Sequence, residues 1–196
     1  MNEREGAAYH EAAHAVAYTR FGSGCGLVTI VENLDENSAG STTSMECTDH
    51  DSIDDTAVTR HVIALLAGYV AGVEHDASVE EVAALGARSD FEKAKELLRR
   101  SGLRQDLRPW LVEARQFVRK EWPAIEMIAR ELLEVNSLDD AEVDCILDIV
   151  DGNTESLAHL AQHRVLMGRN PTRQFPFRIQ RTASPDSGAS SGLDHL

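Results

Sequence analysis

Three residues near the start of the chain have the types and the spacing of a zinc hydrolase site. They are His10, Glu11 and His14, in the pattern H-E-x-x-H. Residues four apart in an α-helix lie on one face, so His10 and His14 can bind one metal ion from the same side. Glu11 can then reach a water molecule on that ion without binding the ion itself. A helical H-E-x-x-H sequence is typical of zinc metalloproteases, in which the Glu is the general base.

The helix that must position these residues is predicted over 3–20. It is rich in Ala, a strong helix former, and Gly22 follows it, where glycine lets the chain leave a helix. The alternative interpretation is an amphipathic surface helix with two solvated histidines. A chance match to the pattern is rare in 196 residues that include 8 His, so the metal site is the favoured interpretation.

Two short strands are predicted after this helix. Residues 27–31 are apolar and mostly β-branched, as in a short buried strand. Residues 38–45 are more polar, which favours a strand at the edge of a sheet. A turn at 35–37 would join the two strands into a small β-hairpin.

An acidic loop at 48–51 follows, and its Asp and His residues resemble a metal cluster in composition. Ser52, with Asp55 three residues later, is a simpler signal for the start of a helix, and this is the favoured interpretation. The helix is predicted over 53–73. Because it is apolar on nearly all sides from Val62 onward, it should be the central buried helix.

Further helices are predicted in the second half of the chain. One of them starts at Ser89 or Asp90, which would cap it, and continues to about Arg100. A long helical segment over 106–135 should be kinked or split at Trp122-Pro123, because proline interrupts a helix.

Two last helices are predicted over 137–150, with Ser137 as the cap, and over 154–167. His159 and His163 lie four residues apart in the second of these. No Glu follows His159, so a pair of surface histidines is the favoured interpretation.

Together these elements predict a mainly α protein of the α+β class. A chain of 196 residues is long enough for one well-buried domain, which is predicted over 1–167. Residues 168–196 are rich in Pro, Ser, Gly and Arg without periodicity, which predicts a disordered C-terminal tail.

The composition argues against several classes of function. A net charge of −14 makes a nucleic-acid-binding surface unfavourable. The longest apolar stretch, 62–73, is too short to cross a bilayer, and no signal peptide is recognisable, so no membrane insertion is expected. Cys25, Cys47 and Cys145 are far apart and odd in number, which favours a reducing compartment. We therefore expect a soluble cytoplasmic protein.

Four stretches of the sequence resemble motifs of one protein family. Residues 9–15, YHEAAHA, are similar to its Y-H-E-A-G-H-A, and residues 28–30 match its V-T-I strand. Residues 65–71, LLAGYVA, are similar to its L-x-G-G-R-A-A, and residues 86–94, GARSDFEKA, to its G-A-S-N-D-L-x-x-A. The family is the zinc peptidase domain of FtsH-type ATP-dependent membrane proteases, and the resemblance spans about residues 5–150.

The resemblance implies a helical zincin-type peptidase domain with Zn²⁺ as its cofactor. In the family, the Asp of the fourth motif is the third zinc ligand, and it matches Asp90 here. The resemblance also implies that substrate adds as an extended strand to the predicted edge strand through main-chain hydrogen bonds, where Ala39, Gly40, Ser41 and Thr42 would contact it.

The chain departs from the family in three respects. Ala13 stands where the family has Gly, which is also small. The acidic residues of the family's R-A-A-E-E are replaced after Ala71 by Gly72 and Val73, and Glu74 could take their role. No G-x-x-x-x-G-K-[ST] loop occurs in the 196 residues, so the chain resembles the peptidase domain without its ATPase module.

These features predict a zinc metallopeptidase that hydrolyses peptide bonds of unfolded or flexible proteins. Glu11 would be the catalytic base, and His10, His14 and Asp90 the zinc ligands. Two alternatives stay open: a catalytically quiet metal-binding interaction module, and another cytoplasmic H-E-x-x-H protease whose third ligand lies elsewhere.

Protein or peptide substrates are the predicted partners. A separate ATPase could supply the unfolding that this chain lacks. The relatives assemble as rings of six, and Gly68 and Gly72 on an apolar helix would permit close packing, so a homo-oligomer is a further prediction.

Overall fold

The computed structural model describes residues 3–31, 40–44, 55–76 and 86–170. Within these ranges the chain is mainly helical, with a small three-stranded antiparallel sheet, so the predicted fold class is confirmed. In chain order the elements are α1 (Glu3–Arg20), β1 (Cys25–Thr29), β2 (Ser41–Ser44), α2 (Asp55–His75), α4 (Arg88–Arg100), α5 (Leu107–Lys120), α6 (Trp122–Val135), β3 (Ser137–Leu138), α7 (Asp140–Val150) and α8 (Ser156–Leu166).

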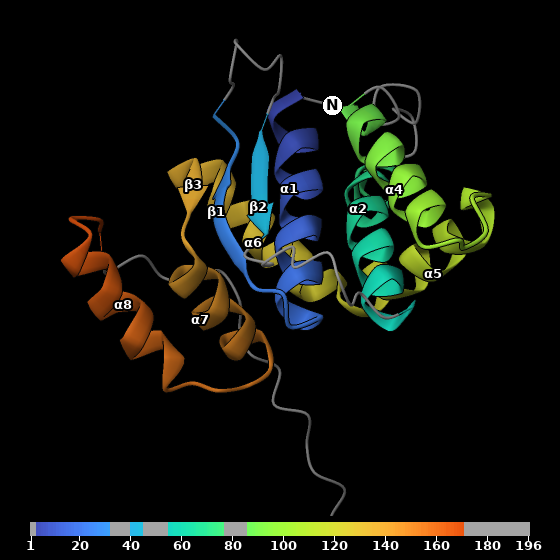
Figure 1. The fold of residues 1–196 in the computed structure, drawn as a ribbon. Coiled ribbons are helices and arrows are strands. Elements are labelled where there is room, and N and C mark those ends of the chain that lie inside the picture. Colours follow the sequence, from blue (N-terminus) through green and yellow to red (C-terminus); the bar gives the residue numbers. More distant parts are fainter. Residues whose placement is uncertain (1–2, 32–39, 45–54, 77–85, 171–196) are drawn as a thin grey trace, which may run out of the picture.

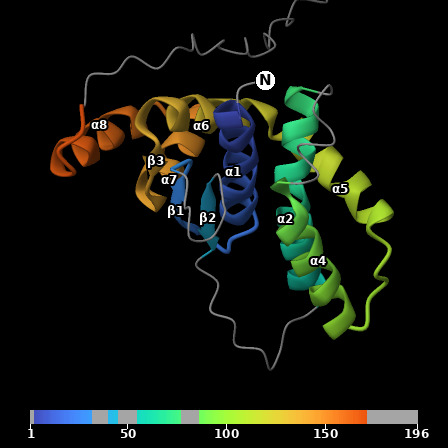
Figure 2. The same cartoon turned by 90° about the horizontal axis from the view of Figure 1, so that it is seen from above.

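Helix α1 lies at the centre of the molecule, between the sheet and α2 (Figures 1 and 2). It begins and ends at the residues that the sequence predicts. From Ala8 to Tyr18 all of its residues except His10 are buried, and many are alanines, whose small side chains let the neighbouring elements approach closely. A helix buried on nearly all sides rarely carries polar groups. The buried side chains of Glu11 and His14 therefore point to a specific role.

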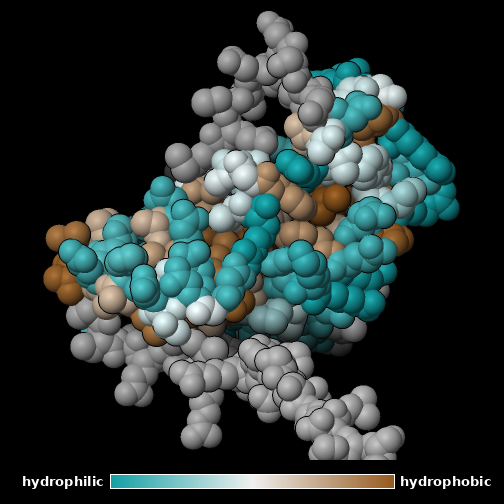
Figure 3. All heavy atoms as spheres, turned by 90° about the horizontal axis from the view of Figure 1, so that it is seen from below, coloured by the Kyte–Doolittle hydropathy of each residue, from teal (hydrophilic) through white to brown (hydrophobic). Residues whose placement is uncertain are grey.

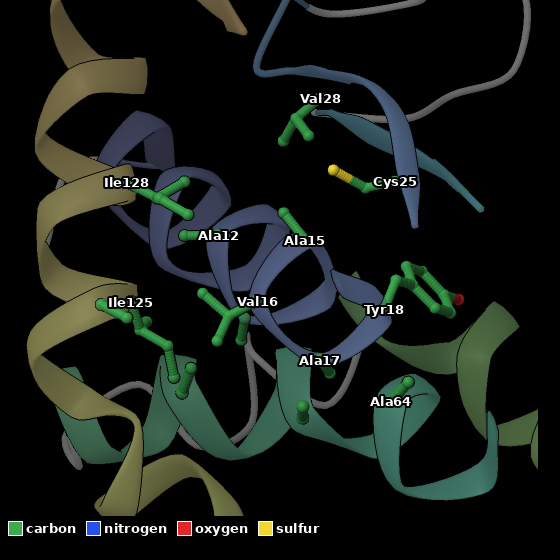
Figure 4. Packing of buried hydrophobic residues seen from close by; sticks show 14 of the residues in the cluster. Ala12, Ala15, Val16, Ala17, Tyr18, Cys25, Val28, Ala64, Ile125 and Ile128 are labelled. Atoms are coloured by element: carbon green, nitrogen blue, oxygen red, sulfur yellow. The ribbon is translucent and has the colours of Figure 1, made fainter. Parts of the chain in front are cut away.

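Figure 4 shows how other elements pack around α1. Ile125 and Ile128 of α6 point toward Ala12 and Val16 of α1. On another side of the helix, Val28 of β1 lies over the same core. Because α1 has apolar neighbours from both α6 and the sheet, its rotation about its own axis is set by packing. The direction of its polar residues follows from that rotation.

Helix α2 packs against α1, α4 and α5, and its buried position confirms the prediction for this segment. By length and composition alone α2 could cross a membrane, because the apolar run at 62–73 continues into a helix of 21 residues. However, 61% of its most apolar window is buried inside the structure. Its contacts are those of a core helix.

The sheet has the strand order β2-β1-β3, and both pairs are antiparallel. Strand β2 lies at an edge, as its polar sequence predicts. Strand β1 begins at Cys25, two residues before the predicted segment 27–31, and ends at Thr29. Gly24 has a positive φ of 67°, which completes the turn after α1 just before Cys25. Pairing with β2, through an irregularity before Val28, then extends the strand beyond its β-branched residues.

Strand β3 was not predicted, and it changes the start of α7. Ser137 pairs with Thr29 in this strand, so the prediction that Ser137 caps the helix is wrong. The cap is Asp139, whose carboxylate accepts a hydrogen bond from the backbone N–H of Glu142 at 3.0 Å. The Glu142 carboxylate accepts from the backbone N–H of Asp139 in return, which completes a capping box.

The predicted interruption at Trp122-Pro123 is confirmed. Helix α5 ends at Lys120 and α6 begins at Trp122. Pro123 lies in the first turn of α6, where its missing N–H costs no helical hydrogen bond. Asp106 caps α5 by accepting a hydrogen bond from the backbone N–H of Arg108.

Helix α8 lies within the segment 154–167 that the sequence predicts. Its two histidines do not form a surface pair. His159 is exposed, whereas His163 is part-buried, with its Nε2 at 2.8 Å from Asp139 Oδ2 at the start of α7. Arg169, past the predicted end of the domain, donates to the Ser137 carbonyl oxygen at 3.1 Å, so the contacts of the domain extend beyond residue 167.

Much of the surface in Figure 3 is hydrophilic. Apolar side chains gather at the end of the molecule that α8 forms, on the left of Figure 3, where Val165, Leu166 and Met167 are exposed. Several predictions lie outside the described residues: the turn at 35–37, Ala39, Cys47, the loop at 48–51, Ser52 and the tail from residue 171.

Candidate metal centre

Helix α1 presents His10 and His14 on one face, one turn apart. Their Nε2 atoms lie 3.0 Å from each other. His14 is buried, and His10 is partly open to solvent, with 18% of its side chain exposed. The two imidazoles therefore converge at the boundary between the core and solvent.

Asp90, from the first turn of α4, completes this cluster. Its Oδ2 lies 3.2 Å from His10 Nε2 and 3.3 Å from His14 Nε2, and its side chain is buried. The prediction that Ser89 or Asp90 caps the helix is wrong, because Ala87 occupies the N-cap and no side chain caps this end. The Asp90 carboxylate, in the first turn of the helix and not at its cap, is thus free to face the histidines.

The three donor atoms form a nearly equilateral triangle with sides of 3.0, 3.2 and 3.3 Å. In a tetrahedral zinc site, bonds of about 2.0–2.1 Å place neighbouring ligand atoms about 3.3 Å apart. Two imidazoles and one carboxylate also form a donor set that leaves a fourth position open. Within the part of the chain that the structure describes, no other group of His, Cys, Asp and Glu side chains converges in this way. The residues present fit a zinc ion.

A contact behind the cluster orients His14. Its Nδ1 lies 2.9 Å from the carbonyl oxygen of Ala64 on α2. Because a carbonyl can only accept, neutral His14 carries its proton on Nδ1 and directs the Nε2 lone pair toward His10 and Asp90. A lone pair that faces a carboxylate oxygen is unfavourable unless a cation lies between them. Such a backbone contact is the usual way in which a metal-binding histidine is held.

The charges around His14 and Asp90 favour a cation at the same place. Burial alone would lower the pKa of the His14 imidazole, but the carboxylates of Asp90 and Glu11 raise it above its ordinary value. Burial alone would raise the pKa of the Asp90 carboxyl, but hydrogen bonds from His10 and His14, which form when their Nε2 atoms carry a proton, hold that pKa well below its usual range. Protons and metal ions compete for these lone pairs, so the same negative potential attracts a divalent cation.

Gly68 on α2 leaves the space that the two imidazoles occupy. A Cβ atom at this position would lie 2.6 Å from His14 Nε2 and 2.7 Å from His10 Cε1. The helix that approaches Gly68 is therefore α1 of the same chain. Gly68 lends no support to packing between copies, and the homo-oligomer stays a prediction.

Replacing Gly68 by Ala is expected to weaken zinc binding by about 10- to 100-fold, the range seen when the surroundings of metal ligands are disturbed. The added methyl group would displace one or both imidazoles. Ala is the better helix former by about 1 kcal/mol, so weaker binding would not reflect a weaker helix. Zinc affinity can be measured by competition with a chelating dye. Gly86→Ala is the matched control, because a Cβ there meets nothing within 4 Å. Equal affinities for the two variants would contradict the steric argument.

Glu11 lies beside this cluster and is only 6% exposed. The hydroxyl of Thr42 donates a hydrogen bond to Glu11 Oε2 at 2.7 Å. At Gly40 an added Cβ would lie 2.9 Å from Glu11 Cγ, so the chain just before β2 passes directly against this side chain. Of the other predicted substrate-contacting residues, Ser41 is exposed and Ala39 lies outside the described residues. The structure thus brings the predicted base, the three predicted ligands and the edge strand together.

Glu74, which could have replaced the acidic residues of the related family, has another partner. Its Oε1 accepts a hydrogen bond from Arg119 Nε at 3.2 Å, in an exposed contact between α2 and α5. The structure therefore gives no support to a role for Glu74 at the metal cluster.

No protein-family model matches the chain, and a search of curated proteins finds no significant match. The resemblance to the FtsH-type peptidase domain therefore rests on the four sequence stretches quoted above, and the activity that it implies stays a prediction. The geometry of the cluster is independent of that resemblance.

Three features of the site were missed by the sequence argument: the Ala64 carbonyl, the clearance at Gly68 and the bond from Thr42 to Glu11. A backbone carbonyl has no sequence signature, so the contact between His14 and the Ala64 carbonyl could not be predicted from the sequence. A glycine on an apolar helix predicts close approach by another element, but the sequence does not indicate that the histidines approach it. The resemblance predicts that Thr42 contacts substrate, whereas its bond to Glu11 depends on how β2 packs on α1.

Proposed function

We propose that the chain is a zinc-dependent metalloendopeptidase that acts on unfolded or flexible proteins. The observation that carries this proposal is the convergence of His10, His14 and Asp90, at distances that suit tetrahedral zinc, with the Glu11 carboxylate beside them. A site that only binds metal for structural reasons needs no buried carboxylate next to an open coordination position.

Four residues would have separate roles in peptide hydrolysis. His10, His14 and Asp90 would hold the zinc ion. When bound, zinc supplies a Lewis acid that polarises the scissile carbonyl group and makes a water molecule more acidic. Glu11 accepts a proton from that water and passes it to the departing amine nitrogen, as a general base and then a general acid. The buried position of Glu11 shields this proton transfer from bulk solvent.

The edge strand β2 supports an extended peptide as the substrate. Among the described residues β2 pairs only with β1, which leaves the main-chain groups of its other edge for a peptide strand. Gly40 and Thr42 bring this edge next to Glu11. Recognition through main-chain hydrogen bonds is weakly selective for sequence but requires an extended segment. Folded proteins rarely offer such segments, so we propose that an ATPase on another polypeptide would have to unfold them.

The proposal is tested by metal analysis and digestion with the purified 196-residue chain. We expect about one zinc per chain, cleavage of an unfolded protein such as casein, loss of cleavage with a chelator and recovery on addition of zinc. A stably folded reporter should resist cleavage, and ATP should not change either rate. Asp90→Ala should lose most of the bound zinc, since it removes a ligand.

Glu92→Ala is the matched control for Asp90→Ala, because Glu92 is an exposed carboxylate on the same helix. Full zinc content in Asp90→Ala would contradict the ligand assignment and favour an H-E-x-x-H protease of another type. Zinc binding without any cleavage of unfolded protein would favour a metal-binding interaction module. Rapid degradation of the folded reporter by the chain alone would show that no separate ATPase is needed.

A further inference from the structure

The side chain of Thr42 faces the Glu11 carboxylate, and its contact is short. Thr42 Oγ1 lies 2.7 Å from Glu11 Oε2 and 3.2 Å from the Glu11 carbonyl oxygen. A hydroxyl has one proton to donate, and an ionised carboxylate can only accept. The shorter contact is therefore a charge-assisted hydrogen bond from Thr42 to Oε2.

The backbone around Thr42 holds this hydroxyl in place. Thr42 pairs with Val28 in the ladder between β2 and β1. Gly40 lies two residues before Thr42, and an added Cβ there would meet the Thr29 carbonyl oxygen at 2.8 Å and Glu11 Cγ at 2.9 Å. The chain thus lies against the Glu11 side chain at residues 40 and 42. Residues two apart in an extended segment lie on the same face, so both are expected to face Glu11.

We propose that Thr42 is a positioning residue for Glu11, and this inference rests on the proposed peptidase function. By holding Oε2, the hydroxyl keeps the carboxylate in one orientation for proton exchange with water. Thr42 acts through Glu11 and is given no contact with substrate or zinc in this role. This role differs from the predicted one, in which the residue contacts the substrate.

The alternative role and the proposed role predict different kinetics. A side chain that binds substrate changes KM, whereas one that orients the base changes kcat. Hydrogen bonds to charged groups are strong enough that loss of this one should lower kcat by about 10- to 100-fold. The hydroxyl is the functional group, so Ser should replace Thr with little loss.

The test compares Thr42→Val, Thr42→Ser and the control Thr59→Val, which removes a hydroxyl that bonds only within α2 to the Asp55 carbonyl oxygen. Zinc content and the kinetic constants for a flexible fluorogenic peptide are measured for each. We expect a lower kcat in Thr42→Val alone, with its zinc content and KM unchanged. Thr42→Ser and Thr59→Val should keep the wild-type activity. In a Glu11→Gln background, Thr42→Val should have no further effect, because the group that it orients is gone.

A second measurement does not depend on activity. The carbon-13 resonance of the Glu11 side-chain carboxyl, assigned by its absence in Glu11→Gln, should shift in Thr42→Val and not in Thr42→Ser. An unchanged kcat in Thr42→Val, a rise in KM alone, or failure of Thr42→Ser to retain activity would overturn the proposal. If the wild type cleaves nothing, the peptidase function fails and a catalytic role for Thr42 fails with it. The carboxyl resonance then still shows whether Thr42 holds Glu11.

Discussion

Replacing Glu11 by Gln is expected to lower kcat for cleavage of unfolded protein by about 10²- to 10⁴-fold, the usual contribution of a general base. The amide cannot accept a proton from water at neutral pH. It has nearly the same shape as the carboxylate and can still accept the hydrogen bond from Thr42. Because Glu11 is proposed as the base and not as a zinc ligand, zinc content should stay the same.

The matched control is Glu3→Gln, which makes the same chemical change at an exposed position of the same helix. This variant should cleave at the wild-type rate. Digestion rates and zinc content, measured side by side for the three proteins, check the expectation. Equal cleavage by Glu11→Gln and the wild type would mean that another group is the base. Loss of zinc in Glu11→Gln would mean that Glu11 belongs to the ligand set.

Replacing Arg164 by Ala is expected to destabilise the fold by about 3–5 kcal/mol, the cost of leaving a buried charge without its partner. Arg164 is 3% exposed. It donates to Glu131 Oε2 at 2.7 Å and to Glu142 Oε1 at 3.1 Å, and both carboxylates are buried. Through these bonds α8 is joined to α6 and α7. With a free energy of unfolding of about 5–15 kcal/mol for a typical domain, such a loss would remove a large share of the stability.

Urea denaturation, followed by circular dichroism, measures this change in the free energy of unfolding. Arg99→Ala is the control, because Arg99 pairs with Glu96 on an exposed helix face, where water and salt screen the ion pair and its loss should change the stability little. The double variant Arg164→Met, Glu131→Leu should recover much of the stability, since it also removes the Glu131 carboxylate, while Glu142 keeps its ion pair with Arg169. A single variant as stable as the wild type would show that the buried charges find other partners.

Local signals account for the parts of the fold that were predicted well. The ends of α1 follow from an Ala-rich segment closed by glycine, and the gap between α5 and α6 follows from Pro123. The polar sequence of β2 predicted its edge position, because an interior strand would have to bury those side chains. In each of these cases the physical cause acts within a few residues of its effect.

The boundaries that were predicted wrongly had more than one acceptable local solution. Ser137 and Asp139 are both good helix caps, and the pairing of Ser137 with Thr29 of β1 decided between them. At the start of α4, Asp90 has the chemistry of a cap but lies within the first turn of the helix, where its carboxylate meets the histidines. Local helix and capping propensities could not decide between these positions. The interactions that decide between them are made with segments far away in the sequence.

The sequence by itself determined that His10 and His14 share one face of a helix with Glu11 next to them, since the 3.6-residue period of the helix dictates it. Only the tertiary structure decided what meets that face. The carboxylate of Asp90, the carbonyl of Ala64, the clearance at Gly68 and the hydroxyl of Thr42 come from three other segments. Their positions depend on how α2, α4 and β2 pack around α1, because distances between separate segments are set by packing and not by any local period.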